Sequence, residues 1–191
     1  MQKNISFLEN LTSYMARIGG GMILICSLLI VLEVFLRKLA NYSIHGIDEY
    51  AGYALSISVA ISLPYTLLKR AHIRVDAFYN ILSNRLSSIL DWLAIFSLAG
   101  FSIFLAYSSY DVFSSSLRFE ATSNTPLSTP LWMPQLLWFI GFLVFMVSCL
   151  IVFVLCTKYL LKGELEKIKS CVGGKSIDEE LAEEIENKNN L

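Results

Sequence analysis

Residues 134–159 read PQLLWFIGFLVFMVSCLIVFVLCTKY and contain one charged side chain, Lys158. About 20 helical residues cross the hydrocarbon core of a bilayer, so this stretch is long enough to span a membrane. Three further long apolar stretches precede it, at residues 18–36, 48–68 and 86–107. The sequence therefore predicts an all-α integral membrane protein with four transmembrane helices.

The basic residues predict the orientation of these helices. Cytoplasmic loops carry an excess of Lys and Arg in membrane proteins. If both termini are cytoplasmic, the outward-facing connections hold only three of the 15 basic residues, and the other twelve face the cytoplasm. The three are Arg37, Lys38 and Arg118. We therefore expect an N-in/C-in topology.

Composition agrees with a membrane protein. Hydrophobic residues make up 55% of the 191 positions and charged residues 16%, which leaves too few polar groups to cover a soluble domain of this size. The basic residues lie where topology alone would place them, so no nucleic-acid-binding surface is indicated. We expect the four cysteines in helices and in the tail, away from the oxidising side, and so predict no disulfide framework.

We expect three segments along the chain. In residues 1–17 apolar side chains recur at helical spacing with polar ones between them, which is typical of an amphipathic helix in the membrane interface. Residues 18–161 form the four-helix membrane domain, and Gly19 near its start permits a close helix approach or a bend. Residues 162–191 form an acidic cytoplasmic tail, which offers at most one short amphipathic helix around residues 177–185.

The second apolar stretch carries small residues at regular spacing. It opens with Asp48 and Glu49, whose carboxylates complement the helix dipole and can cap free N–H groups. Small side chains then recur every fourth residue on one face, at Gly52, Ser56 and Ala60, and on another face at Ala54, Ser58 and Ser62. Small residues let helices approach closely in lipid, so we expect the first face to pack against a helix or a second subunit.

The third stretch continues as a weaker, Ser-rich helical pattern to Leu117. The helix that starts near residue 86 is therefore expected to project beyond the membrane. Residues 125–134 contain three prolines and cannot be helical throughout.

Two carboxylates within the predicted helices are candidates for a proton- or ion-coupling role. Glu33 precedes Arg37 by four residues, in the order that favours an ion pair. Asp91 is expected near the inner interface, within reach of Arg85, Arg74 or water. A second acidic group at mid-membrane, which a proton or ion relay needs, is missing from the sequence. We therefore expect that this chain holds no ion-coupling site.

The two histidines do not indicate a metal or haem site. His45 belongs to the outer first connection and His72 to the inner second one, which places them about 30 Å apart across the membrane. They cannot share a ligand, and we predict no cofactor and no metal. Motifs for hydrolases, zinc enzymes and phosphate loops are also missing from the sequence.

Several short motifs stand in a characteristic order. Arg37 at the end of the first helix is followed by DEYA at residues 48–51, by HIRVD at 72–76, and by LWMP at 131–134 before the fourth helix. With this helix number and topology, residues 8–161 resemble the DctQ-type small membrane subunit of tripartite ATP-independent periplasmic (TRAP) transporters. The structural motif residues are Asp48, Glu49, His72 and Asp76.

The resemblance implies a division of labour in a bacterial inner membrane. In that family a large membrane subunit, of DctM type, carries the sodium and substrate sites, and a periplasmic substrate-binding protein delivers the ligand. The present chain is then a scaffold without catalytic activity, in contact with the large subunit and with membrane lipid. The substrate expected from the family is a small organic anion, such as a dicarboxylate or a sugar acid.

Two other functions remain open from the sequence. A self-sufficient small transporter would use Glu33, although the nearby Arg37 argues against a titrating carboxylate there. A membrane thiol oxidoreductase would need paired cysteines facing the outside, and the sequence has none.

Arg37 is the first candidate for a docking contact with the binding protein. It lies with Lys38 at the outer end of the first helix, against the positive-inside trend. Its basic charge can attract an acidic patch on a transient partner. Alternatively, Arg37 pairs with Glu33 or with Asp48 and Glu49.

Overall fold

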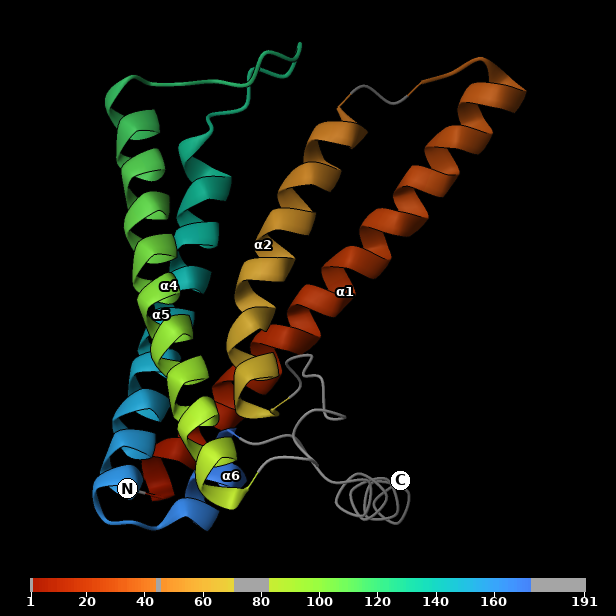
Figure 1. The fold of residues 1–191 in the computed structure, drawn as a ribbon. Helices are drawn as coiled ribbons and strands as arrows, with labels where there is room; N and C mark the ends of the chain where they lie inside the picture. Colours follow the sequence, from red (N-terminus) through yellow and green to blue (C-terminus); the bar gives the residue numbers. More distant parts are fainter. Residues whose placement is uncertain (1, 44–45, 71–82, 173–191) are drawn as a thin grey trace.

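The computed structural model describes residues 2–43, 46–70 and 83–172. Within these ranges the chain is helical apart from its connections and one isolated β-bridge between Thr122 and Pro130. The helices, labelled as in Figure 1, are α1 (Gln2–Ala40), α2 (Ile47–Leu68), α4 (Asn84–Arg118), α5 (Trp132–Leu161) and α6 (Leu165–Val172). His45, His72 and Asp76 lie outside the described residues.

Four of the helices are long and apolar enough to cross a membrane, at Leu8–Ala40, Ile47–Leu68, Arg85–Arg118 and Trp132–Leu161. The prediction of four membrane-spanning helices is therefore confirmed. We call the end of the molecule that carries the α1–α2 and α4–α5 connections the loop end. The opposite end, which carries the start of α1 and α6, is called the terminal end (Figure 1).

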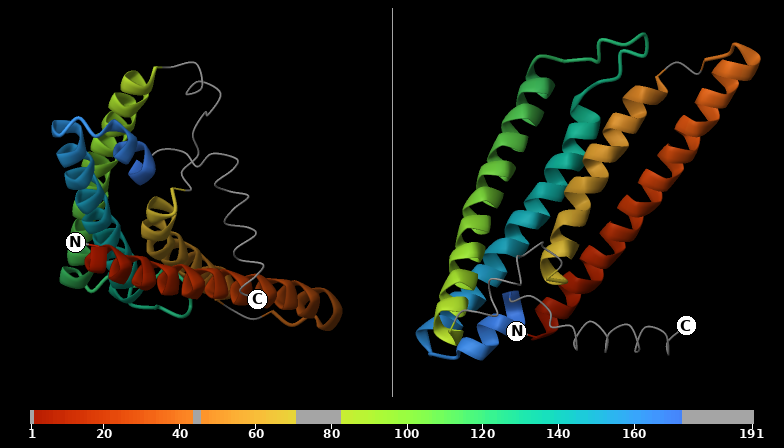
Figure 2. Two further views of the ribbon diagram at one scale, coloured as in Figure 1. Left: turned by 90° about the horizontal axis from the view of Figure 1, so that it is seen from below. Right: turned by 45° about the vertical axis from the view of Figure 1, so that its right-hand side comes forward.

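The long helices lie in a row in the order α1, α2, α5, α4. α1 packs on α2, α2 packs on α5, and α5 packs on α4, while α6 contacts α4 and α5 at the terminal end. α1 runs obliquely and separates from α2 toward the loop end (Figures 1 and 2). α1 lies at the edge of the row and packs on α2. Most of the surface of α1 is therefore left uncovered by the described chain.

Two helices are longer than a bilayer core requires. α1 is continuous from Gln2 to Ala40, so residues 2–17 and the first span form one helix of 39 residues. α4 has 35 residues, about 52 Å at 1.5 Å per residue, against a hydrocarbon core of about 30 Å. The expected extension of this helix beyond the apolar stretch is confirmed, because α4 ends at Arg118.

The buried side of α4 has a seven-residue period. Residues spaced by seven along α4 are all buried: Ser88, Ile95, Ser102, Ser109 and Ser116. A seven-residue period keeps one seam of a helix turned toward its partner, and small side chains let the two backbones approach closely. Ser102 and Ser109 donate hydrogen bonds to the carbonyl oxygens of Ala99 and Ala106, at 2.8 and 2.9 Å, so their hydroxyl groups have acceptors inside the protein.

The start of the tail packs on the membrane helices, which the sequence did not predict. Ile168 of α6 is fully buried and Val172 is 8% exposed. Both belong to one apolar cluster with residues of α2, α4 and α5: Leu67, Ile95, Ala99, Phe145, Cys149 and Cys156. Of the acidic cytoplasmic tail that we expected at residues 162–191, the part that forms α6 therefore packs on the membrane helices. The short helix predicted around residues 177–185 lies outside the described residues.

Candidate docking and packing surfaces

Glu33 and Arg37 form the expected pair near the loop end of α1. Arg37 Nε lies 3.7 Å from Glu33 Oε1, and the Ser43 hydroxyl donates a hydrogen bond of 3.0 Å to the same oxygen. Glu33 is buried, with 7% of its surface exposed, whereas the Arg37 side chain is 61% exposed. The buried carboxylate therefore has one hydrogen-bond donor, Ser43, and one ion-pair partner, Arg37, which still presents its cation at the surface beside the exposed Lys38.

Glu49 does not cap α2, contrary to the expectation from sequence. The residue before the helix is Gly46, with a φ of 89°, and no side chain caps it. A methyl group added to Gly46 would lie 2.0 Å from Leu127 Cδ1, so both the left-handed backbone and the contact with Leu127 favour glycine. Glu49 instead accepts hydrogen bonds from two hydroxyl groups, those of Tyr53 at 2.7 Å and of Thr125.

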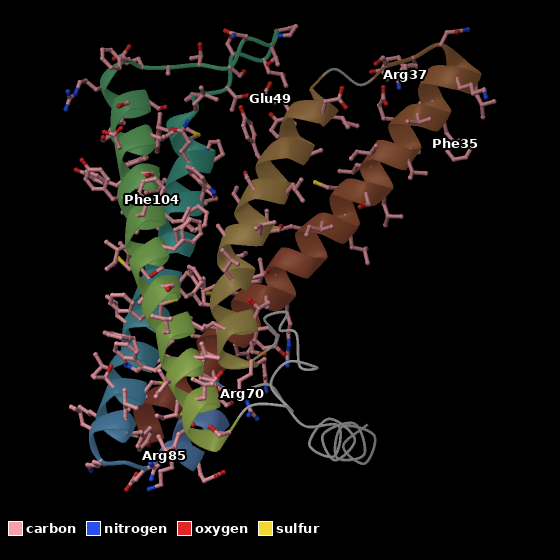
Figure 3. The ribbon with its side chains drawn as sticks, in the orientation of Figure 1. Phe35, Arg37, Glu49, Arg70, Arg85 and Phe104 are labelled. Atoms are coloured by element: carbon pink, nitrogen blue, oxygen red, sulfur yellow. The ribbon has the colours of Figure 1, made fainter. Side chains whose placement is uncertain are left out.

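Thr125 belongs to the connection between α4 and α5, residues 119–131, which we call the strap. The strap folds back on itself, because Ser123 N donates to Thr129 O and Leu131 N to Ala121 O, both at 3.0 Å. Ser123 Oγ also accepts a hydrogen bond of 3.1 Å from Thr129 N. Its tip reaches the start of α2, where Glu49 lies (Figures 1 and 3). The strap thus connects the α4–α5 pair to α2 at the loop end.

The small residues of α2 fall into two environments. Ala60 is fully buried where α2 crosses α5, and a methyl group added to Gly141 of α5 would lie 2.9 Å from its Cβ. Gly52 and Ser56, on the same stripe, are exposed within this chain. The buried stripe includes Ala54 and Ser58, and Gly19 of α1 approaches Ser58 O and Ser62 Oγ. Ala60 is therefore a helix-packing residue, and Gly52 and Ser56 stay candidates for contact with another molecule.

The terminal end buries polar groups between α4 and α6. Asp91 is 1% exposed, with Ser87 and Ser88 one turn earlier on the same side of α4. Ser88 Oγ donates to Leu165 O of α6 at 3.4 Å, and Trp92 Nε1 donates to Thr157 Oγ1 of α5 at 3.0 Å. Asp91, which we expected near the inner interface within reach of Arg85, Arg74 or water, is buried at this end of α4, where α6 packs on the helix.

The surface of α6 is charged. Lys167 Nζ lies 2.9 Å from Glu164 Oε2, and this hydrogen bond lowers the pKa of Glu164 and raises that of Lys167. Both side chains are exposed, so their ion pair adds little to stability. Among the residues that the structure describes, no group of three His, Cys, Asp or Glu side chains could hold a metal ion.

These features define a multi-pass helical membrane protein in which buried polar side chains join helices and loops of the same chain. The chain belongs to the DctQ family: residues 26–158 match the family model for the DctQ component of tripartite ATP-independent periplasmic transporters. It is therefore a small membrane subunit of a TRAP transporter. Searches of curated proteins and of solved structures found no match.

Proposed function

We propose that this subunit is a scaffold for a large membrane subunit of DctM type. The complete transporter would take up a small organic anion, a carboxylate or a sugar acid, driven by sodium and dependent on a periplasmic substrate-binding protein. Membership of the DctQ family supports a role within such a complex. The sodium and substrate sites are then expected in the large subunit.

The observation that carries this proposal is the uncovered surface of α1. Only 11% of the most apolar window of α1 is buried, compared with 28–33% in the other three spans. Leu24, Leu28, Val31 and Phe35 follow each other at helical spacing and are each at least half exposed. Phe35 points away from α2 (Figure 3). A helix that is apolar around its whole circumference is covered either by lipid or by other protein helices.

Photo-crosslinking can show which of the two covers α1. Phe35 and Phe104 are a matched pair, because they are 60% and 62% exposed on membrane helices at opposite edges of the row. We would replace each by a photoreactive phenylalanine analogue in cells that express the whole transporter. We expect Phe35 to give an adduct with the large subunit and Phe104 to give lipid adducts. Lipid adducts alone at Phe35 would contradict the proposed contact.

We place the loop end in the periplasm and both termini in the cytoplasm of a bacterial inner membrane. The distribution of basic residues supports this orientation, with Arg37 at the loop end and Arg70 and Arg85 at the terminal end (Figure 3). Arg37 and Lys38 are then positioned to contact the substrate-binding protein. The exposed Ser56 remains the proposed small-residue contact with a partner subunit.

A further inference from the structure

A groove lies between α1 and α2 in the loop-end half of the molecule. Ile23, Cys26 and Ile30 line one wall, and Ala51, Gly52 and Leu55 line the other. Its volume is about 240 Å³, and its lining is largely apolar. Gly52 has no atom within 4 Å of the position where a Cβ would lie, so the absence of a side chain there helps to keep the groove open.

The depth of the groove matches the hydrocarbon of one leaflet. Ile30 and Ile23 precede Arg37 by seven and fourteen residues, about 10 and 21 Å along α1. One interfacial layer is roughly 5–7 Å thick and half of the hydrocarbon core about 15 Å. If Arg37 and Lys38 lie at the head-group level, the groove covers the depth that an acyl chain of this leaflet occupies.

The chemistry of the groove favours a lipid as its occupant. The walls are largely apolar, as an acyl chain requires, and the groove runs between two neighbouring membrane helices. The last turn of α1 carries the exposed Lys38 at the level where the lipid phosphate would lie, while Arg37 is paired with Glu33.

We propose that the α1–α2 groove binds one acyl chain of a phospholipid of the loop-end leaflet, with the lipid phosphate beside Lys38. The lipid would fill the space left by the separation of α1 from α2. This inference rests on the membrane-spanning helices and not on the proposed scaffold function. It can therefore hold or fail independently of a contact between the large subunit and Phe35, which points away from α2.

The test uses the full-length subunit in its complex, reconstituted with phosphatidylglycerol that carries a diazirine midway along one acyl chain. After photolysis, peptide mass spectrometry locates the adducts. We expect them within residues 23–30 and 51–55. Gly52→Leu places a side chain in the groove and should lower this labelling by about tenfold, because overpacking excludes the occupant. Ser27→Leu, also on the groove wall, should have the same effect and serves if the Gly52 variant does not fold.

Gly100→Leu is the matched control. Gly100 of α4 is likewise exposed and has nothing within 4 Å of its added Cβ, so this substitution should leave the labelling of the groove unchanged. Groove labelling that persists in both groove variants would overturn the proposal. Protein–protein crosslinks at residues 23–30 and 51–55, without lipid adducts, would also overturn the proposal. They would show that a side chain of a partner protein occupies the groove.

Discussion

Glu49 accepts one hydrogen bond from its own helix, through Tyr53, and one from the strap, through Thr125. Its carboxylate is therefore a polar contact between the strap and the start of α2. Asp48, in the same first turn, is exposed. The two adjacent carboxylates thus have different roles, although the sequence presents them as a pair.

Glu49→Gln should loosen the strap. An amide is a weaker acceptor than a carboxylate, and hydrogen bonds to ionised groups are roughly twice as strong as neutral ones. We expect faster hydrogen exchange at the strap amides of Ser123 and Leu131, measured on the purified protein. Asp48→Asn is the control and should leave both exchange rates unchanged. Equal exchange in the two variants would show that the Glu49 contact does not hold the strap.

Arg37→Glu should weaken uptake by the assembled transporter. The substitution reverses an exposed charge at the loop end and also places a like charge next to the buried Glu33. Arg37→Gln separates these effects, because it removes the ion pair without adding repulsion. We expect uptake to fall in both variants, more in Arg37→Glu, while the membrane complex still co-purifies. Normal uptake with an intact complex would leave Arg37 as a helix-end partner of Glu33 only.

At this scale the sequence predicted contacts within one helix and missed those between distant residues. The Glu33–Arg37 pair follows from a spacing of four on any helix. Thr125 is 76 residues from Glu49, and only the folded course of the strap brings them together. The available signal was the prolines of residues 125–134, which excluded a helix but did not indicate where the loop would lie.

The helix pairs depend on positions where no side chain fits. At Gly141 an added Cβ would lie 2.8 Å from the backbone carbon of Ala60 and 3.0 Å from the backbone nitrogen of Ile61. Backbone atoms cannot move aside as a flexible side chain can. The α2–α5 crossing, which joins the two halves of the row, therefore requires glycine at this position.

Gly141→Leu should separate α2 from α5 and lower the free energy of unfolding by about 1–3 kcal/mol or more, the usual cost of overpacking. Denaturation of the purified subunit in detergent would measure the change. Gly100→Leu, in open space on α4, makes the same exchange and should be close to neutral. Ala60→Leu should resemble Gly141→Leu, whereas Ser56→Leu, on the exposed side of α2, should affect only association with a partner subunit. Equal stabilities of the Gly141 and Gly100 variants would contradict the tight crossing.

The sequence indicated small-residue faces but not which face meets which helix. Both stripes of α2 consist of small residues, and only the positions of α1 and α5 show that Ala54 and Ser58 are enclosed while Ser56 is not. On α4 the buried series Ser88, Ile95, Ser102, Ser109 and Ser116 follows a seven-residue period that is visible in the sequence. The burial of α6 was missed because only four of its eight residues, LEKIKSCV, are apolar, and the segment follows Gly163 and Glu164.

The whole molecule should have an even number of crossings with both termini inside. Single cysteines at Asn124 in the strap and at Ser83 before α4 lie at opposite ends, and both positions are exposed. In intact cells a membrane-impermeant maleimide should label Asn124→Cys and not Ser83→Cys. The unmodified protein gives the background from its four native cysteines. Labelling of Ser83→Cys alone would invert the topology.

The number of spans could be predicted from composition, because each apolar stretch has about the length that crosses a bilayer core. The order α1, α2, α5, α4 could not. Helices that are apolar on all sides show no periodic contrast between a protein-facing and a lipid-facing surface. Their neighbours are decided by where small residues let backbones meet, which depends on pairs of helices rather than on one sequence window.

Because α1 separates from α2 toward the loop end, a small rotation of this helix about its contact with α2 would produce a large displacement of its loop end. Gly19 holds α1 close to α2, and Arg37 lies 18 residues further along, about 27 Å away at 1.5 Å per residue. A rotation of about ten degrees about the Gly19 contact would displace Arg37 by roughly 5 Å, a full helical pitch. A lipid or protein that fills the space beside α1 would therefore determine the position of the basic residues at the loop end. It would do so although it contacts α1 at a distance from those residues.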